Sequence, residues 1–227
     1  MISPCAVISN PQSQKHYISL NKLEKDENGR MRASFRERDA DGSYQTINAV
    51  QGAITDIDKS VFRWQEQDIL KLAVTMTAKD GSKTIIQCGY ASVFARNIIT
   101  RLNSTEEFDN IRITPYVFSY KNDKGENKDL ICASVKRHGE ILPICTKSEN
   151  IPPVRYVVIN EKTKQTVRDT GDRDEFYDKL ANEVQAKIRR WNYQQERTNS
   201  KTPSEKRAEV EEIVENMPDG IDCEIPF

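Results

Sequence analysis

The sequence predicts a mainly β protein, in which a small barrel of five strands contains one helix and a second helix follows. Two observations predict this class. Most of residues 17–90 read as short apolar and polar runs divided by turn residues such as Asn28-Gly29. After residue 92 the apolar spacing changes to that of a helix, and a further pair of strands then follows it.

The first part of the chain contains the signals of two hairpins. Asn28-Gly29 and Asp80-Gly81 each separate two strand-like runs, and both dipeptides favour tight turns because they accept positive φ angles. Asp41-Gly42 marks a further turn, and Gly52 is placed as a bulge or bend within a strand. The predicted strands are 17–25, 30–39, 43–50 continuing into 53–57, 69–77 and 83–89.

A helix is predicted over 92–102, because Phe94, Ile98 and Leu102 recur four residues apart. Two strands, 111–120 and 128–136, follow it, and a short apolar run at 141–144 extends the sheet. Strands, one helix and a closing hairpin in this order fit the OB-fold, a five-stranded barrel with its helix after the third strand. A β-sandwich or another small barrel is the alternative that chain order leaves open.

The last third of the chain reads differently. One more strand is expected at 154–160, and an amphipathic helix at 172–191 that packs on the barrel or on a second copy of the chain. Residues 192–201 are polar and read as a linker, a short helix begins at Thr202, and an extended tail follows. The expected division is therefore an OB-fold domain over 1–160, a C-terminal helix over 161–193, and a flexible linker, short helix and acidic tail over 194–227.

Charge is distributed unevenly along the chain, although its net value is only −1. Residues 1–150 contain 21 Lys and Arg against 19 Asp and Glu, and residues 151–200 contain 10 against 8. Residues 201–227 contain 3 against 8, so the net negative charge lies in the tail and the body is mildly basic. The sequence shows no membrane span or signal peptide, and we expect a cytoplasmic protein. Its five widely spaced cysteines argue against a disulfide framework or a zinc site, and no cofactor is expected.

An arginine row is the first candidate binding feature. Every second position of the strand predicted at 30–39 is polar, whereas Met31, Ala33 and Phe35 suit a core. A row of arginines on one strand face can follow the phosphates of a nucleic acid. The alternative is a solvated face neutralised by Glu24, Asp26 or Glu27 across the hairpin. The candidate residues are Arg30, Arg32, Arg36 and Arg38.

An aromatic row is the second candidate. In the strand predicted at 111–120, alternate positions hold Arg112, Tyr116, Phe118 and Tyr120, while Ile113 and its neighbours can supply the core. Aromatic rings beside a cation form a surface on which bases can stack with little sequence preference. The alternative is that these rings are core and that the helix at 172–191 covers the aliphatic face. Trp64, in a polar stretch expected to be a loop next to Arg63, is a further stacking candidate.

The C-terminal tail is the most specific feature. Its acidic residues precede a terminal Ile-Pro-Phe, and this ending closely resembles the C-terminal peptide of bacterial single-stranded DNA-binding proteins. An aromatic residue that ends an acidic tail is also typical of phage single-stranded DNA-binding proteins, and the chain's length and added helix resemble those. The resemblance covers about nine residues, Cys223 interrupts the acidic run, and no DNA-contact residue of the family transfers to this chain. The expected partner-binding residues are Asp219, Asp222, Glu224, Ile225, Pro226 and Phe227.

The resemblance implies a non-enzymatic protein that protects single-stranded DNA in replication, recombination or repair and recruits partners through its tail, in the host cytoplasm if a phage encodes it. The chain can form a homodimer, and no membrane partner is expected. Two other classes stay open. Asp56 and Asp58 share one strand face, as the metal-binding carboxylates of a nuclease would. An adaptor whose barrel and tail both bind proteins is the other.

Overall fold

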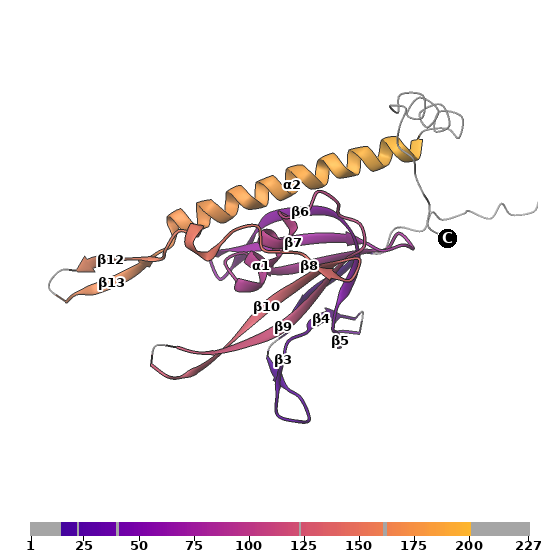
Figure 1. The fold of residues 1–227 in the computed structure, drawn as a ribbon. Helices are drawn as coiled ribbons and strands as arrows, with labels where there is room; N and C mark the ends of the chain where they lie inside the picture. The colour runs from indigo at the N-terminus through magenta and orange to yellow at the C-terminus, as the bar shows by residue number, and fades with distance from the viewer. Residues whose placement is uncertain (1–14, 22, 40, 123, 161–162, 201–227) are drawn as a thin grey trace, which may run out of the picture. The chain divides into compact units, whose positions relative to one another are not determined.

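The computed structural model describes residues 15–21, 23–39, 41–122, 124–160 and 163–200 (Figure 1). The chain divides into two compact units, residues 1–189 and 190–227, and every described strand lies in the first. The short helix predicted at Thr202 and the acidic tail lie outside the described residues. The strands before the first helix are β1 (Lys15–Leu20), β2 (Glu24–Lys25), β3 (Met31–Arg32), β4 (Phe35–Arg38), β5 (Tyr44–Ile47), β6 (Val50–Trp64), β7 (Gln67–Thr77) and β8 (Lys83–Gly89). The later elements are α1 (Val93–Leu102), β9 (Ile111–Lys121), β10 (Asn127–Arg137), β11 (Glu140–Ile141), a short 3-10 turn at Ser148–Asn150, β12 (Arg155–Asn160), β13 (Gln165–Asp169) and α2 (Gly171–Ser200).

Nine strands form one mixed sheet in the order β11-β10-β9-β6-β7-β8-β1-β4-β5. Every pair is antiparallel except β1 and β8, which run parallel. The chain is therefore mainly β with a helix between strands, as predicted, but the sheet is not closed into the expected five-stranded barrel. The physical reason is that β1 pairs with the free edge of β8, and β4 and β5 continue the sheet from there.

The predicted Asp80-Gly81 turn explains the β7–β8 hairpin of the meander β6–β7–β8, whereas the β6–β7 turn falls at Gln65-Glu66, both with positive φ, where the sequence predicts only a loop around Trp64. Gly81 has a φ of +84° at the β7–β8 turn, as an Asp-Gly turn requires. The bulge expected at Gly52 lies instead between Ile54 and Asp56. Gly52 is needed for a different reason: a Cβ there would lie 2.6 Å from the backbone oxygen of Thr77.

The core lies between the inner face of the sheet and α1. The Oγ of Ser92 caps α1 by accepting a hydrogen bond from the amide of Ala95 at 3.1 Å. Phe94 of α1 then meets Phe35 of β4 edge to face, with ring centres 5.8 Å apart. Other fully buried side chains include Ile18, Ile54, Leu72, Val74, Ile86, Ile98, Ile99, Phe108, Ile111 and Ile113.

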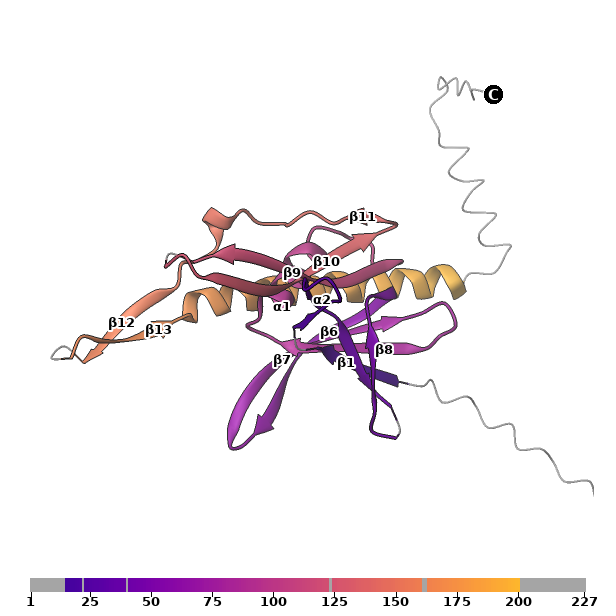
Figure 2. The ribbon, with the colours of Figure 1, turned by 90° about the horizontal axis from the view of Figure 1, so that it is seen from below.

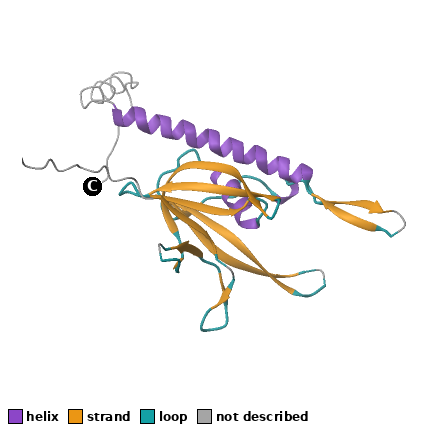
Figure 3. Ribbon diagram, turned by 180° about the vertical axis from the view of Figure 1, so that it is seen from behind, coloured by secondary structure: helices purple, strands orange, loops and turns teal. Residues whose placement is uncertain are grey.

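Within the first unit, residues 171–189 of α2 pack against the body (Figure 3). Tyr177, Val184 and Ile188 are buried, so the amphipathic stripe that the sequence predicts covers the core. Lys59 of β6 binds Asp178 at 2.8 Å. Burial alone would raise the pKa of Asp178, but the hydrogen bond from Lys59 lowers it below its usual value. Among the described residues, no helix is long and apolar enough to cross a membrane.

The predicted linker at 192–201 is wrong through residue 200, because α2 continues to Ser200. Polar residues such as Gln, Glu and Arg are good helix formers, and this segment contains neither Gly nor Pro to end the helix. Polarity alone therefore does not distinguish a linker from an exposed helix. The expected domain boundary at 193/194 falls inside this helix.

The strand predicted at 154–160 exists as β12, but its partner β13 was missed. β13 has only one apolar residue, Val167, and so gives no alternation signal. The two strands form a separate two-stranded sheet that connects to α2 (Figure 1). The run at 141–144 contributes only its first residue to β11.

Candidate functional site

The nine-stranded sheet has one buried face and one face that carries most of the candidate residues. Residues opposite each other on neighbouring strands point to the same side. Arg112 lies opposite Lys136 on β10 and opposite Gln51 on β6, so the β9 row shares its side with the outward residues of β6. The same registers, followed through β7, β8, β1 and β4, place Arg36 and Arg38 on this side too. We call this side the outward face.

The three aromatics of β9 are exposed on the outward face. Tyr116, Phe118 and Tyr120 are 42%, 53% and 40% exposed, whereas Ile111 and Ile113, which alternate with the row, are fully buried. The alternative that these rings form the core is therefore wrong. The rings of Phe118 and Tyr120 are nearly parallel, at 15°, with centres 6.3 Å apart. We call these three residues the aromatic platform.

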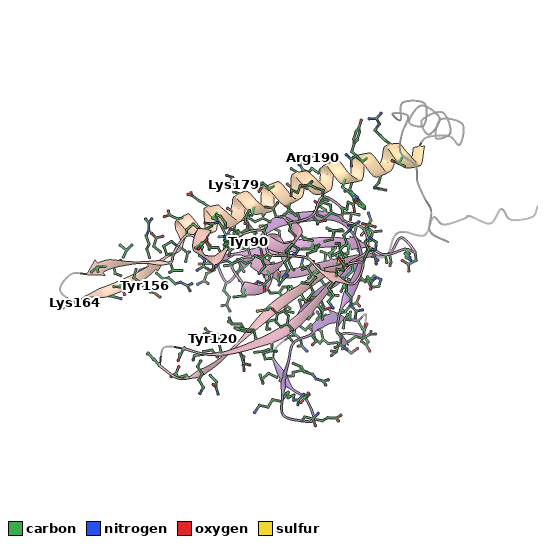
Figure 4. The ribbon with its side chains drawn as sticks, viewed as in Figure 1. Tyr90, Tyr120, Tyr156, Lys164, Lys179 and Arg190 are labelled. Atoms are coloured by element: carbon green, nitrogen blue, oxygen red, sulfur yellow. The ribbon has the colours of Figure 1, made fainter. Side chains whose placement is uncertain are left out.

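Cations surround the aromatic platform. Exposed Arg112 and half-buried Lys136 lie side by side at one end, and Lys128, which forms an exposed ion pair with Glu126 at 3.2 Å, lies opposite Tyr120 toward the other. Lys121 and Lys124, at the tip of the β9–β10 hairpin, are also exposed (Figure 4 labels Tyr120 near this tip). The platform therefore combines flat apolar rings with a positive surround, the two properties that a nucleic-acid strand requires.

The tyrosine of the platform nearest the core stays protonated. Partial burial raises the pKa of Tyr116 above its usual value, and the neighbouring Cys132 adds to this. Burial likewise raises the pKa of the Cys132 thiol. At neutral pH both side chains are uncharged, and the Tyr116 hydroxyl can donate a hydrogen bond.

The predicted arginine row is not continuous. β3 ends at Arg32 and β4 begins at Phe35, because the chain bends at Ala33-Ser34 and buries Ser34. Arg32 binds Asp26 at 3.2 Å, and the same carboxylate accepts the backbone amide of Arg30 at 2.8 Å. The hydrogen bond from the Arg30 amide is the main cause of the lowered pKa of Asp26. For Arg32 the neutralised alternative is therefore right, and Arg30 belongs to the turn rather than to a strand.

Arg36 and Arg38 remain on the outward face, together with two tyrosines that the sequence reasoning missed. The Arg36 guanidinium lies 5.1 Å from the ring centre of Tyr44, and Arg38 is directly opposite Tyr44 in the sheet. Tyr17 lies on the same face of β1 as Ser19, two residues later, and Ser19 pairs with Arg36, so Tyr17 also lies on the outward face. Both tyrosines are more than half exposed. The alternation of polar and apolar positions around each tyrosine is the signal in the sequence that indicates this side.

Trp64 is the last residue of β6 and pairs with Gln67, so it lies in a strand rather than in the predicted loop. Its side chain is outside the described part of the structure. Phe62, two residues earlier, is exposed, and the Lys71 ammonium lies 4.0 Å from its ring centre. Figure 2 shows the β6–β7 hairpin extending beyond the neighbouring strands. This hairpin thus carries a second combination of aromatic and cation.

Two further places in the molecule carry polar groups: the carboxylates of Asp56 and Asp58, and a cavity beside α2. Asp56 and Asp58 are exposed, and the carboxylate of Asp56 accepts the amide of Ile57. No group of three His, Cys, Asp or Glu that could hold a metal occurs among the described residues. A cavity of about 270 Å³ between β6, β7 and α2 contains the Lys59–Asp178 ion pair, with the Lys59 ammonium 4.7 Å from the Tyr90 ring centre. Lys59 and Asp178 bind each other there and Gln185 donates to the backbone oxygen of Ile57 at 2.9 Å, while the buried Tyr90 hydroxyl has no hydrogen-bond partner among the described residues.

The predicted partner-binding residues of the tail lie outside the described residues. The geometry thus brings Arg36, Arg38, Arg112 and the aromatic platform onto one side of the sheet and leaves Arg30 and Arg32 in a turn. No family model, curated protein or solved structure matches this chain.

Proposed function

We propose that this protein binds single-stranded DNA without sequence preference through the outward face of its sheet. The observation that carries the proposal is the exposed aromatic platform with cations at both ends. Three exposed aromatic rings in a row on one strand face form a contiguous patch, and such patches mark interaction surfaces more often than single exposed rings do. Each stacked base contributes roughly 1–3 kcal/mol with little preference among bases.

The strand order supports an OB-type origin for this surface. The order β10-β9-β6-β7-β8, with α1 between β8 and β9, is compatible with a five-stranded OB unit whose last closing contact is absent. OB-folds bind nucleic acid on the face of their second and third strands and with the loops after the first and fourth. In this chain those loops correspond to the tips of the β6–β7 and β9–β10 hairpins; Phe62 lies on the strand leading to the first tip, and the aromatic platform on the strand leading to the second.

The tail is proposed to recruit partner proteins of replication, recombination or repair. Its apolar Ile225, Pro226 and Phe227 would fill a pocket, and the terminal carboxylate, with Asp222 and Glu224, would pair with basic residues at the rim. Asp219 would contribute at the periphery of that contact. The proposal describes a binding protein, without catalysis.

Fluorescence anisotropy with a labelled 30-nucleotide strand tests the DNA proposal. The expected results are strong preference over the same sequence as duplex and a steep loss of affinity as salt rises, because phosphate contacts release counterions. The double variant Phe118→Ala, Tyr120→Ala should lose at least tenfold in affinity. Ser119→Ala is the matched control, because Ser119 lies on the same strand but points to the opposite face and contacts Asp129.

Equal binding of duplex, indifference to salt, or an unchanged double variant would each overturn the DNA proposal. The tail proposal is tested separately by removing residues 219–227. The truncated protein should bind DNA at least as tightly as the full chain and lose its partners in a pull-down. Retention of those partners would contradict the assigned role of the tail.

A further inference from the structure

The β12–β13 hairpin is a surface to which the preceding sections assign no role. It forms its own two-stranded sheet and pairs with no other strand of the described residues. Its described side chains are exposed along both strands. An isolated pair of strands is marginally stable in water, so side chains left exposed on it contribute little to the fold. Their chemistry therefore indicates what the hairpin contacts.

The two faces of the hairpin differ. Tyr156 lies directly opposite Arg168, and Val157 lies directly opposite Val167. Because side chains alternate, Tyr156 and Arg168 share one face, while Val157 and Val167 share the other; Ile159 lies at a register shift between Val158 and Asn160. Tyr156 is 70% exposed, the highest value among the exposed large hydrophobic residues of the described chain. One face thus presents Tyr156 and Arg168 beside Val158, and the other presents Val157 and Val167 with Arg155 and Asp169 at the base.

The cations of the aromatic face are free to bind an anion. Neither Arg168 nor Lys164 forms an ion pair within the described residues. Lys164 lies at the tip of the hairpin with a φ of +52° (Figure 4 labels it with Tyr156). In contrast, Arg155 at the base binds Asp172 of α2 at 2.7 Å. That ion pair anchors the base of the hairpin to the start of α2 and leaves the outer cations unneutralised.

We propose that the Tyr156 face of the β12–β13 hairpin is an additional contact for single-stranded DNA, in which Tyr156 stacks on a base and Arg168 and Lys164 bind phosphates. The inference rests on the proposed function. It repeats the aromatic and cation combinations of the aromatic platform and of Phe62 with Lys71 on a third hairpin. Charge complementarity to phosphate favours a nucleic acid on this face, since the two described cations face no acid that pairs with them.

The β12–β13 and β9–β10 hairpins extend as separate projections in Figures 1 and 2, so we expect that only a strand long enough to span both contacts the Tyr156 face and the aromatic platform together. The hairpin should therefore matter for long strands and not for short ones. Single-stranded oligonucleotides of 8 and 30 thymidines, titrated against the full chain by anisotropy, separate the two contributions. Tyr156→Ala should weaken binding of the 30-mer about 5-fold or more and leave the 8-mer unchanged. Tyr156→Phe should restore the 30-mer affinity, because the ring and not the hydroxyl carries the stacking.

A charge variant and a matched control complete the design. Arg168→Ala should lower the slope of log affinity against log salt for the 30-mer by about 1. The double variant Val157→Thr, Val167→Thr changes the opposite face of the same hairpin and should leave both affinities unchanged. The melting temperature of each variant is first compared with that of the wild-type protein. If Tyr156→Ala melts at a lower temperature, the DNA affinity of Tyr156→Phe is the comparison that separates the ring from the fold.

The outcomes distinguish this inference from the proposed function. Unchanged 30-mer binding by Tyr156→Ala, with a loss in the Phe118→Ala, Tyr120→Ala variant, overturns the hairpin contact alone. Unchanged binding in both variants overturns the proposed function as well. If Val157→Thr, Val167→Thr alters the oligomeric state by light scattering while Tyr156→Ala binds normally, the hairpin is a contact between copies of the chain and the inference is wrong.

Discussion

β9 and the segment 30–38 have the same kind of sequence pattern, yet only β9 presents it as a surface. In both, polar or aromatic residues alternate with apolar ones. β9 is paired along its whole length with β10, and its alternation is preserved from Ile111 to Tyr120. The segment 30–38 breaks at Ala33-Ser34, pairs with different strands on each side of the break, and uses Arg32 in an ion pair.

The difference teaches that alternation predicts a face only where a strand is long and continuously paired. In the segment 30–38, a carboxylate four residues before Arg30 competes for the backbone amide, and the hairpin tip becomes a unit of its own. In β9, no carboxylate of the described residues accepts a backbone amide between Ile111 and Lys121, so the strand stays regular. Each aromatic ring therefore lies on the face that strand alternation predicts.

The largest expected effect is on stability. Ile113→Ala, on the buried side of β9, should lower the free energy of unfolding by about 2–5 kcal/mol, because it leaves a cavity in the core. Met31→Ala, on a two-residue strand and partly exposed, should cost less than about 1 kcal/mol. Urea denaturation measures both. Similar costs would show that the interrupted segment is packed as tightly as β9.

The next effect concerns binding. Phe118→Ala alone should cost roughly 1–3 kcal/mol of affinity for a 30-nucleotide strand, since it removes one stacked ring. Arg32→Ala should change that affinity by less than twofold, because Arg32 is already bound to Asp26. Anisotropy titrations at one salt concentration compare the two, and a larger loss for Arg32→Ala would reverse the assignment of the two regions.

A smaller effect should separate the arginines within the segment 30–38. Arg36 lies on the outward face over Tyr44, so Arg36→Ala should lower the salt slope of DNA affinity by about 1. Arg30→Ala should leave the slope unchanged, because Arg30 lies in the turn. Titrations between 50 and 300 mM salt, roughly the range over which phosphate contacts dominate, determine each slope.

The smallest effect is a pH response confined to the turn. The pKa of Asp26 is lowered from 3.8 by the amides of Arg30 and Asn28, so the folded turn favours the carboxylate. Its contribution is present above pH 3.8 and is lost as the pH falls through the lowered value. In an NMR titration, the amide chemical shifts of Asn28 and Arg30 should change with a midpoint below pH 3.8. The amide chemical shifts of β9 residues that face away from carboxylates should not change over this range. A midpoint at or above 3.8 would contradict the Asp26 contact.

The sequence predicts local structure well and long-range pairing poorly. β8 has the predicted bounds, α1 and β9 differ from the prediction by one residue at one end, and β10 differs by one residue at each end, because each has strong periodicity and clear turn residues. The parallel pairing of β1 with β8 leaves no local signal, so the sheet was expected to close. β13 and the helical residues after 191 were missed because exposed elements carry little apolar pattern.

Only part of the candidate site could be predicted, because local patterns are visible in the sequence and long-range packing is not. The β9 row could be read from alternation alone, but whether it faced water depended on which side α1 and α2 cover, and that follows only from tertiary packing. Tyr17 and Tyr44 join Arg36 through the pairings of β1 with β4 and of β4 with β5, so the cluster draws on three separate strands. No pattern within one strand contains that information.

The position of β1 has a consequence for how the chain is made. Lys15 pairs with Lys83, and Ser19 with Gln87, so β1 meets its parallel neighbour β8 only after β6, β7 and β8 have been synthesised. At ordinary translation rates this delay is on the order of several seconds. During that time the edge of β1 that pairs with β8 stays open even after β4 has formed the other pairing, and Lys15 and His16 at the start of β1 discourage association with other chains. Sheet completion should therefore be a late event of biosynthesis, dependent on contacts across many residues.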